Sequence, residues 1–139
     1  MIALAEPVEF HAQELVLSAG QRSRYLYLLV SGSLSIELNN KLYQVHIQAL
    51  GPGEAFGWSA LLPHQDTLFD VRTRERCTAV RLDGARLDAA LQEDPVFAAD
   101  LFRRTLQLVA GRVQATEIRL GELCGVRPAR AETNPKSQE

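Results

Sequence analysis

The sequence predicts a mainly β fold, a small β-roll or barrel, followed by one short helix and one long helix. Three observations predict it. Residues 8–82 contain short runs of alternating apolar and polar residues between turn signals, which is typical of strands. Residues 83–123 carry apolar residues at helical spacing behind capping aspartates. Within the first part, residues 51–62 hold three glycines in seven positions, which marks a tightly turned segment.

Composition favours a single domain that binds neither nucleic acid nor a membrane. The 139 residues are 46% hydrophobic, so we assign one domain to residues 1–125 and a disordered tail to the polar residues 126–139. The formal net charge is −2 and the pI about 5.9, which gives no general attraction to nucleic acid or acidic lipid. Only two cysteines occur, and no apolar run approaches the ~20 residues that span a bilayer. We therefore expect a cytoplasmic protein.

The strand patterns are separated by short turn signals. Ala19-Gly20, Ser31-Gly32 and Asn39-Asn40 interrupt the apolar runs. Between the last two turns, every second residue from Leu34 to Leu38 is apolar and the others are polar. On this basis we predict strands over residues 14–18, 25–30, 33–38, 42–47, 69–73 and 77–82.

Two helices follow the strands. Asp83 is expected to cap a helix over residues 84–92, and Asp94 with Pro95 begins a second helix that runs to about residue 123. The long helix has apolar residues in alternating steps of four and three, the heptad spacing through which two helices pair. We therefore expect a homodimer whose seam consists of Phe102, Leu106, Val109, Val113, Thr116, Leu120 and Leu123.

The glycine-rich segment, residues 51–62, is the first candidate for a site. Its apolar second half is long enough for only one or two helical turns. A helix that opens directly after a turn presents unpaired N–H groups, which favour an anion.

The order of these segments resembles the cyclic nucleotide-binding domain of the catabolite activator (CRP/FNR) type. Residues 14–32 are similar to the opening strands, residues 51–62 to the phosphate-binding cassette, residues 82–95 to the short helix, and residues 111–123 to the dimer helix. The resemblance implies a double-stranded β-helix, or jelly roll, and a regulatory rather than enzymatic protein without catalytic residues. In the family a helix-turn-helix normally follows the long helix. No such pattern follows here, so we expect no DNA binding by this chain.

The resemblance also implies a ligand site with altered chemistry. In the family, backbone N–H groups and an arginine hold the cyclic phosphate, and a carboxylate accepts the ribose hydroxyl. Here the cassette glycine matches as Gly57, but the carboxylate position holds Trp58 and the arginine position falls at Thr67. The expected ligand-binding set is Gly53, Glu54, Phe56, Gly57, Trp58, Ser59, Ala60, Thr67, Leu68 and Thr116.

Losing both side-chain partners has an energetic consequence. The charge-assisted contact is worth ~1.5–3 kcal/mol and the ribose contact about 1 kcal/mol, so cyclic nucleotides should bind roughly two to three orders of magnitude more weakly. The ligand is then a weakly held cyclic nucleotide or another small anion, and no cofactor is required.

Two positions allow alternative interpretations. Trp58 could fill the pocket, stack on a flat ligand or cap the core. Thr116 matches the family threonine that contacts the base across the dimer. It could equally set the helix register, or donate to the carbonyl four residues earlier.

Three functions remain open from the sequence. The favoured one is a dimeric sensor domain with an altered pocket, and the second is a dimerisation or protein-interaction module whose pocket Trp58 fills. The third is a cupin-type metalloenzyme, for which His11, His46 and His64 are the only histidines and lack the spacing of a metal set. Cys77 lies in an apolar strand pattern and is expected to be a core thiol.

Overall fold

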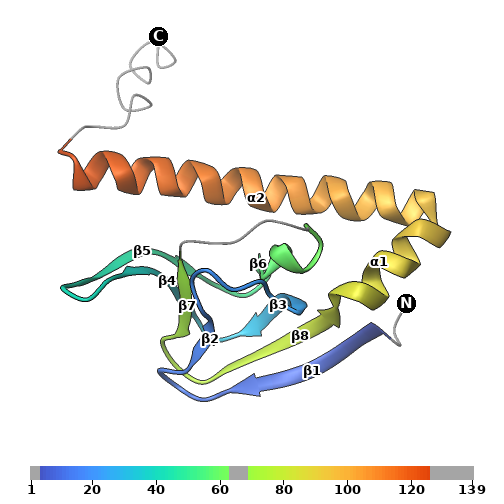
Figure 1. Cartoon of the computed structure of the whole chain (residues 1–139), viewed down its shortest axis with the longest axis horizontal. Helices are drawn as coiled ribbons and strands as arrows, with labels where there is room; N and C mark the ends of the chain where they lie inside the picture. Colours follow the sequence, from blue (N-terminus) through green and yellow to red (C-terminus); the bar gives the residue numbers. More distant parts are fainter. Residues whose placement is uncertain (1–3, 63–68, 126–139) are drawn as a thin grey trace, which may run out of the picture.

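The computed structural model describes residues 4–62 and 69–125. It contains two antiparallel four-stranded sheets, with strand orders β1-β8-β3-β6 and β2-β7-β4-β5, followed by a short and a long helix. The predicted jelly-roll architecture is therefore confirmed (Figure 1). The strands are β1 (Ala5–Phe10), β2 (Leu15–Leu17), β3 (Tyr25–Ser31), β4 (Leu34–Asn39), β5 (Gln44–Leu50), β6 (Ala55–Phe56), β7 (Asp70–Thr73) and β8 (Cys77–Asp83).

The strand predictions need three corrections. Two strands, β1 and β6, were not predicted: β1 pairs along its whole length with β8, and β6 pairs with β3 through two residues. The strand expected at residues 42–47 begins only at Gln44. Leu42 and Tyr43 belong to the preceding turn, because their backbone N–H groups donate to the Asn40 side chain at 2.7 and 2.8 Å.

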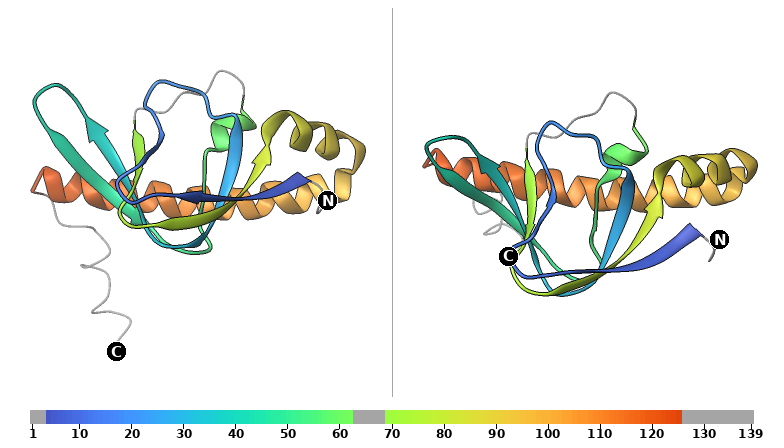
Figure 2. Two further views of the ribbon diagram at one scale, coloured as in Figure 1. Left: turned by 90° about the horizontal axis from the view of Figure 1, so that it is seen from below. Right: turned by 60° about the horizontal axis from the view of Figure 1, so that its bottom comes forward.

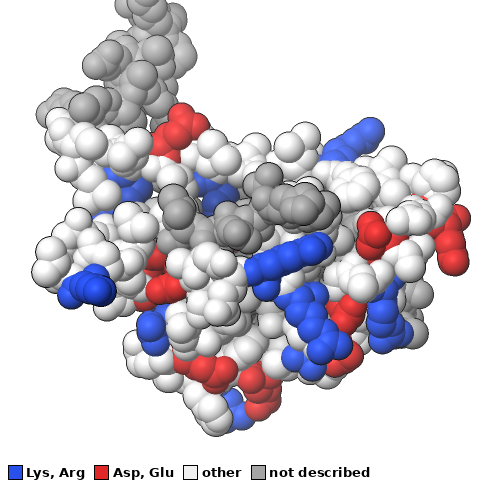
Figure 3. Space-filling view, viewed as in Figure 1, with Lys and Arg blue, Asp and Glu red and all other residues white. Residues whose placement is uncertain are grey.

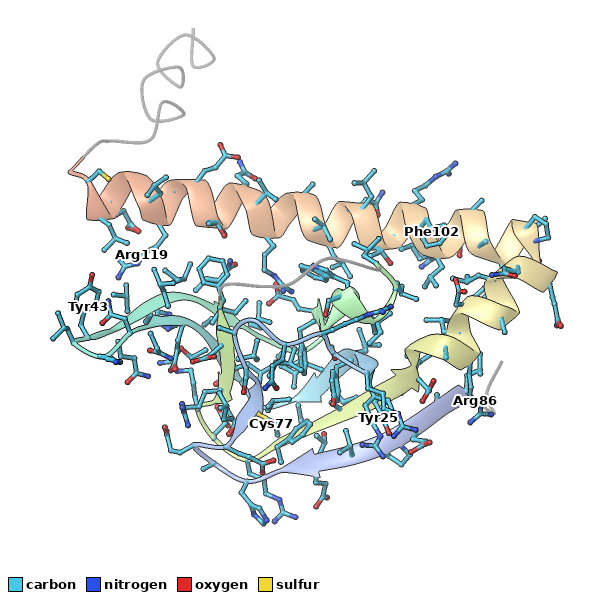
Figure 4. All side chains as sticks on the ribbon, in the orientation of Figure 1. Tyr25, Tyr43, Cys77, Arg86, Phe102 and Arg119 are labelled. Carbon is cyan, nitrogen blue, oxygen red and sulfur yellow. The ribbon has the colours of Figure 1, made fainter. Side chains whose placement is uncertain are left out.

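The two sheets enclose the main core. Inward-facing apolar side chains meet between them, among them Leu34, Leu50 and Phe56, which are at most 1% exposed. The Tyr27 and Phe56 rings stack at 4.7 Å between centroids, which fixes β6 against β3. Cys77 also lies in this core, as expected, and burial raises the pKa of its thiol (Figure 4).

Both helices begin and end close to their predicted bounds. Helix α1 spans Gly84–Glu93 and helix α2 spans Pro95–Leu123. The caps are those predicted: the Asp83 carboxylate accepts from the N–H groups of Ala85 and Arg86, and the Asp94 carboxylate accepts from Phe97. A second apolar cluster around Leu26, Leu87 and Leu91 joins α1 and the start of α2 to the roll.

Helix α2 runs along one side of the roll in all three views (Figures 1 and 2). None of its 29 residues is fully buried, so the helix lies on the surface of the roll and is not enclosed by it. No described helix is long and apolar enough to cross a membrane. Acidic and basic side chains are interspersed over the roll on the face shown in Figure 3.

The glycine-rich segment forms a turn and then one short 3₁₀ turn, η2 (Trp58–Ala60). The turn docks on β3, because Gly53 N–H donates to Leu29 O and Leu29 N–H donates to Glu54 O, both at 2.9 Å. Gly57 begins η2 with a left-handed backbone, φ 82°. A Cβ there would lie 2.6 Å from the Tyr25 carbonyl oxygen, so only glycine lets the segment pass this close to β3.

The second cluster should contribute most of the stability of the helical part. Leu87 is 0% exposed, so Leu87→Ala leaves a cavity and should lower the free energy of unfolding by ~2–5 kcal/mol in urea denaturation. Leu42→Ala is the matched control, because Leu42 is 88% exposed and its loss should change stability by less than about 0.5 kcal/mol. Equal effects of the two substitutions would contradict the described packing of α1.

The two positive-φ glycines of the glycine-rich segment make a second matched pair. Gly53→Ala meets nothing within 4 Å at φ 91°, so it should cost only the backbone penalty of ~1–2 kcal/mol. Gly57→Ala adds the contact with Tyr25 and should lower the free energy of unfolding by at least ~1 kcal/mol more. Urea denaturation of both variants would measure this difference. A Gly57→Ala variant no less stable than Gly53→Ala would show that Gly57 is not packed against β3.

Candidate functional site

A cavity of about 480 Å³ lies between the roll and α2. This volume is within the ~300–1,000 Å³ of small-molecule sites. Apolar side chains of the roll form one wall, including Leu17, Ile36, Phe56 and Val71. The other wall is one face of α2, which contributes Val109, Arg112, Val113, Thr116, Glu117 and Leu120. A molecule in this cavity would therefore touch both parts of the domain at once.

Arg112 is the only arginine among the described residues that line this cavity. Its Nη2 donates to the Ala55 carbonyl oxygen, and its guanidinium carbon lies 4.4 Å from the centre of the Trp58 ring, which is a cation–π contact. Its Nε is buried and has no hydrogen-bond acceptor among the residues that the structure describes. No carboxylate of the described ranges lies within ion-pairing distance of it.

Burial weakens the proton affinity of this guanidinium. It lowers the pKa of Arg112 to about 10, although the negative charge of Glu54 opposes the effect. Arg112 is therefore still a cation at neutral pH. Because the pKa of Arg112 in the folded state lies below that of the free side chain, its burial disfavours folding at every pH below about 10. The direct contacts of this cation, the Trp58 ring and the Ala55 carbonyl oxygen, are thus neutral, and Glu54 acts on it without forming an ion pair.

Thr116 takes part in a hydrogen-bond chain between α2 and β5. Its hydroxyl donates to the Arg112 carbonyl oxygen at 2.9 Å, which is the local interaction expected as one alternative from the sequence. Gln48 of β5 donates from Nε2 to the same hydroxyl oxygen at 3.0 Å. Thr116 therefore holds α2 against the roll in addition to lining the cavity.

The cassette side chains are mostly bound within the protein. The Ser59 hydroxyl accepts from the Ser23 N–H at 2.9 Å, and the Glu54 carboxylate accepts from the Gly51 N–H at 2.7 Å. Trp58 packs against the Leu26, Leu87 and Leu91 cluster and borders the cavity, which stays open beside its ring. The segment η2 has three residues, so the helical N-terminus expected to hold an anion is a single 3₁₀ turn.

The structure brings together only part of the predicted ligand-binding set. Thr67 and Leu68, like His64, lie outside the described residues. Gly53, Glu54 and Ala60 are not among the lining residues, whereas the others are: Phe56, Gly57, Trp58, Ser59 and Thr116.

The predicted seam divides into two groups. Val109, Val113, Thr116 and Leu120 line the cavity. Phe102, Leu106 and Leu123 do not, and they are 50%, 67% and 53% exposed. Figure 4 shows Phe102 near the α1 end of α2, away from Arg119.

Sequence reasoning missed Arg112 and Gln48. The available signal for Arg112 was its spacing, since it lies four residues before Thr116 and therefore on the same helix face. Gln48 gave no local signal. His46 Nδ1 lies 2.6 Å from the Ser35 hydroxyl, and the described part of the chain contains no group of three residues that could hold a metal.

Comparisons with known proteins agree with this architecture. A cyclic nucleotide-binding domain from Methylobacillus flagellatus is 17% identical, with a TM-score of 0.76 over 84% of this chain and 66% of that one. The regulator CLP of Xanthomonas campestris, described as c-di-GMP-responsive, is 22% identical, with a TM-score of 0.75 over 88% of this chain and 61% of CLP.

A third structure is the regulatory subunit of a protein kinase A from Trypanosoma brucei that is described as cAMP-independent. It is 20% identical, with a TM-score of 0.61 over 86% of this chain and 41% of that one. The chain thus spans less than two thirds of each of these three proteins, and at such identities the likeness shows the fold alone.

A search of curated proteins gave no match. The family model described as the cyclic nucleotide-binding domain matches residues 7–94, which is more than half of the 139 residues. Together with the jelly roll, the short helix and the long helix, this match establishes the family: the chain belongs to the cyclic nucleotide-binding domain family.

Proposed function

We propose that this chain is a non-enzymatic regulatory domain that works as a dimer and senses a small molecule other than cAMP or cGMP. The observation that carries this proposal is the cavity shared by the roll and α2. A ligand there contacts Val113 and Leu120, which belong to the predicted seam, so occupancy can alter how α2 pairs.

Weak binding of cyclic nucleotides follows from the side chains near the cavity. Trp58 stands where the resemblance places a ribose-binding carboxylate, and Ser59 and Glu54 already accept hydrogen bonds from the protein. A similar fold occurs in the regulatory subunit of a protein kinase A that is described as cAMP-independent, so the fold is compatible with a regulator that does not depend on cAMP.

Transmission to a second copy would use the helices. Pro95 begins α2 directly after α1, so the two helices are joined by a single short break that can act as a hinge. Phe102, Leu106 and Leu123 of α2 are exposed and belong to the predicted seam. A row of exposed apolar residues at heptad spacing is typical of a helix that pairs with another.

A second candidate is a dimerisation or protein-interaction module without a ligand. The packing of Trp58 against the Leu87 cluster favours it, because a tryptophan with a structural role needs no ligand. The open cavity beside the ring favours the sensor instead. The cupin-type metalloenzyme has no supporting residue cluster in the described ranges.

Cyclic nucleotides should not bind this chain at concentrations that saturate a family member carrying both the phosphate-binding arginine and the ribose-binding carboxylate. The expected loss of affinity is roughly two to three orders of magnitude. Trp58 is the only tryptophan and lines the cavity, so its fluorescence reports directly on the site. We expect no saturable change in emission or melting temperature with cAMP or cGMP at micromolar concentration. Saturable binding of either nucleotide in that range would overturn the proposal. Native mass spectrometry of the purified protein is a separate test of the sensor, because it would reveal a retained small molecule.

The dimer has its own test in the exposed seam residues of α2. Leu106 is 67% exposed and does not line the cavity, so Leu106→Glu should convert a dimer into a monomer in sedimentation velocity without loss of the fold. Val96→Glu is the matched control, because Val96 is 81% exposed and lies outside the heptad positions. A wild-type protein that sediments as a monomer would contradict the dimer.

A further inference from the structure

Arg112 forms no ion pair with any described residue, although its guanidinium is partly buried and borders the cavity. The guanidinium is enclosed between the Trp58 ring and the Ala55 carbonyl oxygen, and its Nε has no acceptor. A buried charge with neutral partners is costly, and an anion hydrogen-bonded to it offsets that cost. Guanidinium groups bind carboxylates in particular, because the planar donors match the two oxygens.

The rest of the cavity offers little to a polar ligand. Leu17, Ile36, Phe56 and Val71 form its roll side. Of the other polar groups, Gln48 and Thr116 are bonded to each other and the Ser59 hydroxyl accepts from Ser23. Gln21 adds one neutral amide, and Glu117 adds a negative charge that disfavours highly charged anions. A ligand with several hydroxyls or phosphates would therefore lose hydrogen bonds to water that the cavity does not replace.

We propose that the cavity takes a small amphipathic monoanion, a carboxylate on an apolar body, with the carboxylate on Arg112 and the body against the roll. This rests on the proposed function and names the ligand class of the same site. Arg112 belongs to α2 and the apolar wall to the roll, so a bound ligand would contact both parts of the domain. The ligand class differs from a cyclic nucleotide in carrying a carboxylate in place of a cyclic phosphate, and in having no sugar.

The test compares octanoate with octan-1-ol, which have the same apolar body and differ in the charge of the head group. Isothermal titration calorimetry should show wild type binding octanoate about ten-fold or more tightly than octan-1-ol, because a charge-assisted hydrogen bond is gained. Arg112→Met should lose that preference, with octan-1-ol affinity changed less than about three-fold.

Two further variants keep the test independent of folding defects. Arg119→Met is the matched control: Arg119 lies on the same helix and also donates to a roll carbonyl, His46 O at 3.0 Å, but does not line the cavity (Figure 4). It should bind both probes as wild type does. Arg112→Lys keeps the charge and should retain part of the preference for octanoate, even if Arg112→Met fails to fold.

The outcomes separate the two proposals. Equal affinity of wild type for octanoate and octan-1-ol, or an unchanged preference in Arg112→Met, overturns the monoanion while leaving a sensor with a neutral ligand. If wild type binds neither probe and native mass spectrometry finds no retained molecule, the monoanion and the sensor both fail. Tighter binding of cAMP than of octanoate also overturns the monoanion.

Discussion

The domain depends on a row of polar contacts that fastens α2 to the roll. Arg112, Thr116 and Arg119 lie one turn apart on one face of the helix and bond to Ala55, Gln48 and His46 respectively. The start of α2 also packs on the Leu26, Leu87 and Leu91 cluster, but no residue of the helix is fully buried, so beside the cavity these polar contacts hold it to the roll. A neutral hydrogen bond is worth about 0.5–1.5 kcal/mol and one from a charged donor about 1.5–3 kcal/mol, so the docking of α2 can respond to a ligand that binds with comparable energy.

The same helix face serves the cavity and the predicted pairing of two copies. Val113 and Leu120 line the cavity and are also 51% and 61% exposed, so each can contact a ligand on one side and a second helix on the other. A shift of α2 by a fraction of a turn would alter both contacts together. In the proposed sensor, ligand binding and dimerisation would be coupled through these shared residues, without a separate relay.

What the sequence could predict depended on how local each signal was. Both helices were found almost to the residue, because Asp83, Asp94 and Pro95 act within their own first turns. Strand β1 was missed because Pro7 and two glutamates interrupt the alternation of apolar and polar residues. The strand forms because it pairs with β8, some seventy residues later in the chain. The role of Arg112 was missed for the same reason, since Trp58 reaches it only after folding.

Trp58 and Arg112 together show how a fold of the cyclic nucleotide-binding domain family could hold a ligand other than a cyclic nucleotide. By the resemblance, position 58 would carry a carboxylate, which would lie beside Arg112 and neutralise it. An indole there keeps the cation–π contact at 4.4 Å but supplies no negative charge, and it makes the cavity wall more apolar. In the proposed site, an indole at this position would leave no partner for a ribose and would leave Arg112 open to an anionic ligand. The backbone that turns at Gly57 is unaffected, so the fold persists while the chemistry of its cavity changes.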